Sequence, residues 1–196
     1  MDCWSCGAER GQAVFCGTCK KLQPVPKGRT YFDALGLPKR QAVDLQVVEQ
    51  HFRENAKEVH PDRFAQSSPI ERKLALEHTT LVNQAYRTLK DPASRAEYLL
   101  GLEGVVVGKE EARTQDPAFL MEMLELQEAI GEAKDSVVLD RQAAALKVRR
   151  ERLLEQARGY FDDHLGTRDE IARALDELRY LRRLDQSLEV RFEELG

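Results

Sequence analysis

The sequence predicts an all-α protein, and three observations support that class. Apolar residues recur at spacings of three and four through most of the chain, which is the period of an amphipathic helix. Charged residues make up 33% of the 196 positions, above the typical quarter, and many of them lie in the periodic stretches beside leucine and alanine. Only 12 glycines and 7 prolines are present. The hydrophobic share of 42% suffices for the core of one or two compact domains.

Composition also argues against several function classes. The net charge is −4 with the two signs interspersed, so we expect no nucleic-acid partner, because such binding normally needs a basic field. The longest apolar runs fall well short of the roughly twenty residues of a membrane span. The first residues, Met1-Asp2-Cys3-Trp4, contain an acid and resemble neither a secretory signal nor a mitochondrial presequence. The bacterial cytoplasm is therefore the expected location.

Residues 1–24 are predicted to form a small metal-binding module. All four cysteines lie there in two C-x-x-C pairs: Cys3, Cys6, Cys16 and Cys19. A two-residue gap lets two thiolates of one turn reach a single tetrahedral ion, and Gly7 and Gly17 permit the backbone conformations of such turns. Structural Zn²⁺ is the expected occupant, since four thiolates leave no open position for catalysis. Iron, a redox pair or two disulfides are the alternatives, and disulfides are rare in a reducing compartment.

A hairpin of two helices is predicted after this module. Leu45, Val48, Phe52, Ala56 and Val59 form one apolar stripe, and His60-Pro61 should end that helix because proline restricts the residue before it. Ser67 or Ser68 with Glu71 is a capping pattern for the second helix. Its own stripe ends at Asp91-Pro92 and consists of Leu74, Leu81, Ala85, Tyr86 and Leu89. A stiff loop around His60-Pro61-Asp62-Arg63 should join the two helices.

Taken alone, His60 and Asp62 also fit a plain helix stop, in which the imidazole complements the helix dipole and the carboxylate caps a turn. An acid–base pair in an enzyme is the weaker alternative, since no orienting third group or phosphate-binding loop lies nearby in sequence. We therefore expect no catalysis by this chain.

The rest of the chain is predicted to be a linker, residues 101–115, and an antiparallel three-helix bundle, residues 116–196. Glycines between Gly101 and Gly108 interrupt the helical pattern, and Asp116-Pro117 restarts it. Three periodic stretches follow, at residues 118–133, 136–161 and 167–194. Loops this short favour antiparallel neighbours.

The first helix of this bundle carries more apolar residues than one core stripe requires. Phe119, Met123, Leu126 and Ile130 share one face and suffice for the core. Leu120, Met121 and Leu124 lie on a second face, which Glu125, Glu128 and Glu132 continue. Either this is a wide core stripe beside ordinary solvated glutamates, or it is an exposed apolar patch with an acidic rim, as at protein-binding sites.

Several motifs together resemble a known family. Tyr31-Phe32-Asp33-Ala34-Leu35-Gly36-Leu37-Pro38, His60-Pro61-Asp62-Arg63-Phe64-Ala65 and Val82-Asn83-Gln84-Ala85-Tyr86 are similar to a J-domain, which would span residues 28–100. Arg95-Ala96-Glu97-Tyr98-Leu99-Leu100 and Asp116-Pro117-Ala118-Phe119-Leu120-Met121 resemble, more specifically, the HscB co-chaperones of iron–sulfur cluster assembly. Some members of that family also carry a tetracysteine extension.

The resemblance implies roles for two surfaces. The loop of His60, Pro61, Asp62 and Arg63 would dock on an HscA/DnaK-type chaperone and stimulate its ATPase. The face that holds the IscU scaffold protein in that family would correspond here to Leu120, Met121, Leu124, Glu125, Glu128, Glu132 and Tyr180. Two departures concern the chaperone contact: the helix before the loop mixes acids with Arg53, Lys57 and His51, and Val59 replaces a usual aromatic residue.

The resulting expectation is an adaptor that brings an IscU-type scaffold to an HscA/DnaK-type chaperone. The alternative within the same class is a general J-domain co-chaperone whose bundle captures unfolded clients. A zinc-dependent enzyme or redox protein at the N-terminus is the rival from another class.

Overall fold

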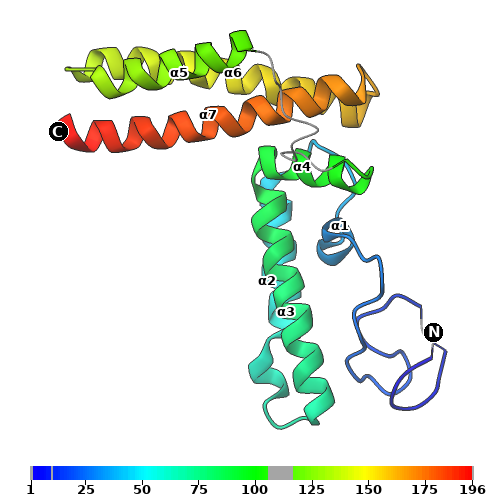
Figure 1. Ribbon diagram of the computed structural model, residues 1–196. Helices are drawn as coiled ribbons and strands as arrows, with labels where there is room; N and C mark the ends of the chain where they lie inside the picture. The colour runs from blue at the N-terminus through cyan, green and yellow to red at the C-terminus, as the bar shows by residue number, and fades with distance from the viewer. Residues whose placement is uncertain (1, 10, 106–116, 196) are drawn as a thin grey trace. The chain divides into compact units, whose positions relative to one another are not determined.

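The computed structural model describes residues 2–9, 11–105 and 117–195 (Figure 1). The helices are α1 Tyr31–Leu35, α2 Leu45–Val59, the 3₁₀ turn η1 Pro61–Phe64, α3 Pro69–Lys90, α4 Pro92–Leu102, α5 Pro117–Glu132, α6 Ser136–Asp163 and α7 Arg168–Leu195. Within these residues the only β-type pairing is two isolated bridges, Asp2 with Glu9 and Phe15 with Leu22. The predicted all-α class is confirmed. None of the described helices is long and apolar enough to cross a membrane.

The chain divides into two compact units. The N-terminal unit comprises Met1–Lys39 and Val43–Asp91, and the C-terminal unit comprises Arg40–Ala42 and Pro92–Gly196. The predicted hairpin domain extends to residue 100, and its last helix, α4, packs in the C-terminal unit. The reason is its apolar face: Ala93, Ala96 and Leu100 belong to the same core as the last three helices. Most of the predicted linker lies outside the described residues. The same is true of Asp116, where the helical pattern was predicted to restart.

In the N-terminal unit, α2 and α3 form the predicted hairpin, and α1 packs against both. Asp44 caps α2, whose last residue is Val59, as the His60-Pro61 pair predicts. The predicted cap of α3 is formed by Ser68, whose hydroxyl accepts the Glu71 N–H at 3.3 Å. Phe52 of α2 stacks on Tyr86 of α3 with ring centroids 4.1 Å apart, so the two stripes meet as their spacing predicts.

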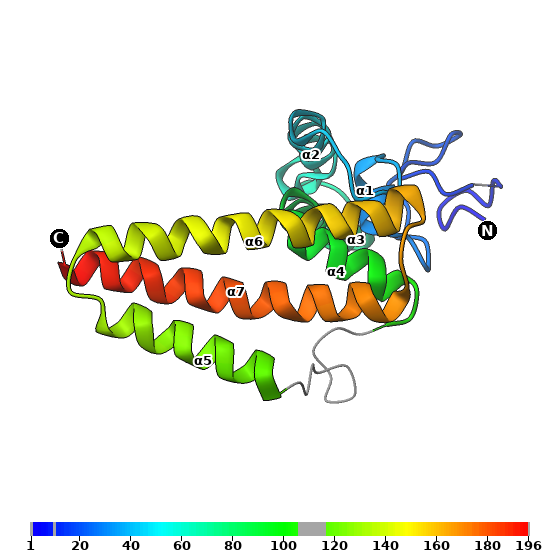
Figure 2. The same cartoon turned by 90° about the horizontal axis from the view of Figure 1, so that it is seen from above.

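In the C-terminal unit, α5, α6 and α7 run side by side, and α7 packs against both of the others (Figure 2). The predicted bundle is therefore present. Apolar residues of all three helices form its core, with Ile130, Leu139, Leu175 and Leu181 essentially inaccessible.

Two polar contacts attach other segments to this bundle. The Asp162 carboxylate accepts the backbone N–H groups of Gln41 and Ala42, both at 2.7 Å. The Arg179 guanidinium makes a two-pronged contact with Glu97 of α4, at 3.0 and 3.1 Å. Such charge-assisted pairs are the stronger class of hydrogen bond, so they help to hold α4 and the segment before α2 in this unit.

Candidate functional site

The four cysteines converge on one point in the N-terminal unit. Their Sγ atoms all lie within 4.8 Å of one another, and all four thiols are free. Cys3 and Cys19 are 3.6 Å apart at sulfur, and Cys6 and Cys16 are 3.8 Å apart. A tetrahedral ion with metal–sulfur bonds of about 2.3 Å requires sulfur atoms about 3.8 Å apart. The donor set and its spacing therefore fit one four-thiolate metal site.

Two similar turns hold the thiols in place. In the first, the Gly7 N–H donates to the Cys3 carbonyl at 3.0 Å, and in the second the Lys20 N–H donates to the Cys16 carbonyl at 3.0 Å. Gly7 and Lys20 occupy the same position in each turn, both with positive φ, at 71° and 59°. The prediction for Gly17 is thus wrong. The residue with positive φ lies four positions after the first cysteine of each pair, whereas Gly17 directly follows Cys16.

The thiols differ in how readily they lose a proton. Burial alone would raise the pKa of Cys3, but N–H groups of Cys6 and Ser5 and neighbouring thiols lower it to about 6. For Cys6, the Ala8 N–H lowers the pKa, while burial and the sulfur atoms around it outweigh that effect and raise the pKa to about 12. The N–H groups of Cys19 and Thr18 also lower the pKa of Cys16. Two thiols of the cluster thus favour the thiolate form while Cys6 disfavours it, and a bound cation would relieve the repulsion among the thiolates.

The cysteine module is joined to α3 by buried contacts. Leu22 and Gln23 are completely inaccessible, and His78 Nε2 lies 2.7 Å from the Gln23 carbonyl. The Trp4 indole N–H donates to the Leu22 carbonyl at 2.7 Å. Lys21 completes the contact, with its ammonium 3.0 Å from a Glu71 carboxylate oxygen. The module thus has a packed base on α3 in addition to its sulfur cluster.

The loop after α2 exposes three of its predicted contact residues, His60, Asp62 and Arg63. The His60 side chain is 54% exposed and the Asp62 side chain 91% exposed, and η1 holds them in one tight turn. The Asp62 N–H donates to His60 Nδ1 at 3.3 Å, which fixes the direction of the ring. Arg63 turns the other way, and its Nη1 donates to the Lys57 and Glu58 carbonyls at 3.2 and 3.3 Å. It therefore satisfies the last turn of α2, a role that the sequence did not predict.

The exposed face of α2 carries both signs, as the sequence predicts. Arg53 pairs with Glu49 one turn away. His51, which we expected on this surface, is half-buried instead, with Nδ1 2.7 Å from the Leu35 carbonyl of α1. That side chain helps to hold α1 on the hairpin.

The predicted patch on α5 is exposed. Leu120, Met121 and Leu124 are 41%, 56% and 52% exposed, whereas Met123 and Ile130 on the core face are buried. Glu125, Glu128 and Glu132 are exposed beside them, so this face is an exposed apolar patch with an acidic rim and not part of a wide core stripe. We call Leu120, Met121, Leu124 and these three glutamates the α5 patch. Tyr180, also predicted to belong to it, is partly buried and packs against the bundle core.

Aromatic and cationic side chains pack against one another beside the α5 patch. The Phe119 ring meets Tyr180 edge to face with centroids 5.3 Å apart. Arg149 of α6 lies 6.0 Å from the Phe119 centroid and pairs with Glu122 of α5 and Glu177 of α7. Arg183 lies 5.4 Å from the Tyr180 centroid. Neither arginine was predicted from the sequence. The partners of Arg149 lie on other helices, so no spacing along the chain links them, whereas Arg183 and Tyr180 are one turn apart on α7, a spacing that the sequence does contain.

Comparisons with known proteins cover both units. Residues 30–98 match the family described as the DnaJ domain, and residues 115–189 match the family described as the HSCB C-terminal oligomerisation domain. The co-chaperone protein HscB of Proteus mirabilis is 35% identical over 164 residues, which cover 81% of this chain and 93% of that protein. The iron–sulfur cluster co-chaperone protein HscB of Mus musculus is 28% identical over 193 residues, which cover 96% and 82%.

Solved structures give the same result. The crystal structure of human co-chaperone protein HscB has a TM-score of 0.89 at 28% identity, with 97% of this chain and 98% of that chain covered. Chaperone HscB from Vibrio cholerae has a TM-score of 0.75 at 30% identity, with 85% and 99% covered. The similarity to known structures therefore extends through both units.

Proposed function

Because the chain belongs to the HscB family of J-domain co-chaperones of iron–sulfur cluster assembly, we propose that it delivers an IscU-type scaffold protein to an HscA/DnaK-type chaperone. The observation that carries this proposal is the α5 patch, where three large apolar side chains are about half-exposed beside three exposed glutamates. Apolar groups grouped in this way, with a polar rim, are typical of sites that bind another folded protein.

The chaperone contact would be made by the loop of His60, Pro61, Asp62 and Arg63. Pro61 fixes its own φ and lies in η1, so the backbone that presents the exposed His60 and Asp62 side chains loses little further freedom on docking. The ATPase chemistry would remain in the chaperone, and this chain would supply the contact that stimulates it. Arg63 would contribute chiefly by holding the loop against the end of α2.

The metal of the cysteine module is proposed to be Zn²⁺. Four thiolates in a closed set suit a structural zinc ion, which would supply folding free energy to a segment that has little core of its own. Cys3, Cys6, Cys16 and Cys19 would hold it. A redox or iron centre is the alternative, and the bacterial cytoplasm, where thiols stay reduced, is the compartment that we propose.

The decisive experiment measures ATP hydrolysis by the chaperone in single turnover, with this chain alone, with the scaffold alone and with both. We expect stimulation by the chain, and further stimulation when the scaffold is present. His60→Gln should abolish the effect of the chain while leaving scaffold binding intact. Normal stimulation by that variant would refute the proposed role of the loop.

A general J-domain co-chaperone for unfolded clients is the second candidate, because an exposed apolar face can also hold extended peptides. Titration of the chain with the folded scaffold and with unfolded model peptides distinguishes the two. Tight binding to the scaffold with weak peptide binding supports the adaptor, and the reverse order supports the general co-chaperone.

A further inference from the structure

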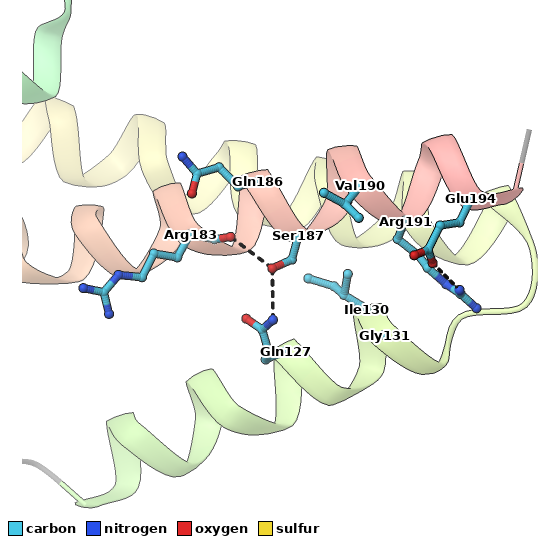
Figure 3. A pocket seen from close by; sticks show the side chains of 9 residues that line it. All are labelled: Gln127, Ile130, Gly131, Arg183, Gln186, Ser187, Val190, Arg191 and Glu194. Atoms are coloured by element: carbon cyan, nitrogen blue, oxygen red, sulfur yellow. Dashed lines mark hydrogen bonds and ion pairs between the residues drawn. The ribbon is translucent and has the colours of Figure 1, made fainter.

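A groove between α5 and α7 continues the α5 patch. Its volume is about 580 Å³, and its lining includes Gln127 and Gly131 from α5 and Arg183, Ser187 and Val190 from α7. Figure 3 shows Gln127 and Ser187 facing each other across it, with Gln127 Nε2 donating to the Ser187 hydroxyl at 3.0 Å. Val190 is 56% exposed on one wall. The groove is thus open, mixed in polarity and large enough for side chains of another protein.

The two arginines of the groove differ in what they are free to bind. Arg191 is fully engaged, because Nη1 lies 2.6 Å from Glu194 and the rest of its guanidinium donates to the Ala133 carbonyl. Arg183 is exposed, and among residues 117–195 no carboxylate pairs with it. Its guanidinium stands over the Tyr180 ring instead. The available positive charge of the groove therefore lies beside a residue of the predicted binding face.

The negative charge lies on the opposite side of the apolar residues. At 100° per residue, the surface of α5 presents Gln127 first, then Leu120 and Leu124, and then Glu128, Met121 and Glu125 in that order. Gln127 lines the groove. Leu120 and Leu124 thus lie between a basic edge at Arg183 and an acidic edge at which Glu128 and Glu125 flank Met121.

We propose that the two edges fix the orientation of the bound partner: an acidic group of the docked scaffold lies over the groove at Arg183, and a basic group lies over Glu125 and Glu128. This inference rests on the proposed function, in which the α5 patch binds the scaffold. Reversing the partner would bring like charges together at both edges, which is costly, whereas the correct orientation gains at both. Arg183 is then a specificity residue of the binding face.

Charge reversal at Arg183 tests the proposal, because the proposal and its alternative predict opposite changes in scaffold affinity. If the scaffold were basic throughout its contact surface, as the glutamates alone suggest, Arg183→Glu would remove a repulsion and tighten binding. The proposal requires the opposite, a loss of about tenfold in affinity for the purified IscU-type scaffold, shrinking as salt is raised. Glu128→Lys should also weaken binding.

Three controls accompany this measurement. Arg152→Glu makes the same charge change at an exposed position of α6 outside the groove and should leave affinity within about twofold. Arg183→Lys keeps the charge and should bind nearly as the parent chain does. Thermal unfolding should be unaltered, which excludes damage through the lost contact with Tyr180. Equal or tighter binding by Arg183→Glu would overturn the proposal.

Failure of the proposed function gives a different pattern. If alanines at Leu120, Met121 and Leu124 leave scaffold affinity unchanged, the patch does not bind the scaffold, and the orientation proposal is overturned with it. If those alanines weaken binding and Arg183→Glu does not, only the orientation proposal is wrong. Sedimentation of the chain alone adds one more outcome: a dimer that Arg183→Glu dissociates would assign the groove to self-association and overturn the proposal.

Discussion

Lys21 and Glu71 lie fifty residues apart in the chain, and their side chains form an ion pair with Nζ and Oε2 3.0 Å apart. The Glu71 side chain is 10% exposed and also accepts the Ser68 hydroxyl of the α3 cap. Lys21 in turn lies 5.8 Å from the centroid of the Trp4 ring. One carboxylate thus connects the cap of α3 with the base of the cysteine module.

Removal of the metal should loosen only part of the module. We expect elemental analysis to find one zinc per chain, and a chelator to abolish the near-ultraviolet signal of Trp4, the only tryptophan. The far-ultraviolet helix signal should remain, because both units have apolar cores of their own. In hydrogen exchange, residues between Cys3 and Cys19 should lose protection, while Leu22 and Gln23 keep theirs under α3. A metal-free preparation with a full Trp4 signal would contradict this.

The pair at Glu71 should make stability depend on pH. Burial raises the pKa of this carboxyl, but the hydrogen bonds from Lys21 and Ser68 lower it by more. The pKa of Glu71 therefore lies below its ordinary value. Its contribution to folding is therefore fully present above the unfolded pKa of about 4.3 and is lost as the pH falls through the folded pKa. Glu71→Gln should lower the free energy of unfolding by about 1–3 kcal/mol at neutral pH. Urea unfolding of both forms should converge in acid.

Glu77→Gln is the matched control for that comparison. Glu77 also lies on α3 and pairs with Lys73, but at 3.8 Å and with 44% of its side chain exposed. Such exposed pairs contribute little, so this variant should change stability by no more than about 0.5 kcal/mol at any pH. A pH-independent difference between Glu71→Gln and the parent chain would mean that packing, not charge, is lost.

Local and periodic features of the fold were predictable from the sequence. The end of α2 at Val59 follows from a proline, and the start of α3 follows from Ser68 and Glu71. The excess of apolar residues around Leu120 follows from counting the faces of one helix, but its exposure was expected only from the family resemblance. Each of these depends on residues at most a few turns apart. The convergence of the two C-x-x-C pairs was also predictable, because four thiolates are the ligand set of a single tetrahedral ion.

The features that could not be predicted depend on contacts between distant segments. Nothing near Asp162 indicates that its carboxylate accepts the N–H groups of Gln41 and Ala42. The packing of α4 in the C-terminal unit likewise depends on distant partners, the core residues of α6 and α7, which no local pattern identifies. Side-chain direction was the third difficulty, because Arg63 follows Asp62 in the loop and yet binds the end of α2.

His60 and Arg63 should respond differently to substitution. His60→Gln should abolish ATPase stimulation and change the free energy of unfolding by no more than about 0.5 kcal/mol, because the side chain is exposed. Arg63→Ala should cost about 1 kcal/mol, since it leaves the Lys57 and Glu58 carbonyls without their side-chain donor. Chemical unfolding and single-turnover hydrolysis measure the two effects. An Arg63→Ala chain as stable as the parent would show that this cap contributes nothing.

Stability and scaffold binding should depend on opposite faces of α5. Ile130 is 1% exposed, and Ile130→Ala should lower the free energy of unfolding by about 2–5 kcal/mol because it leaves a cavity in the bundle core. Alanines at Leu120, Met121 and Leu124 together should cost far less, since half of each side chain is already in water. Binding should show the reverse order, with the three alanines weakening the scaffold complex by several kcal/mol if they form its centre.

Val148→Ala supplies the control for loss of an exposed apolar group. Val148 is 66% exposed on α6, so its truncation should alter neither stability nor binding appreciably. Calorimetric titration with the scaffold, together with thermal unfolding of every variant, separates the two effects. If the triple variant unfolds as readily as Ile130→Ala, its side chains act as core residues, and weakened binding would no longer be evidence for a docking face. Intact stability with lost binding leaves direct contact as the explanation, because the bundle that presents these residues would be unchanged.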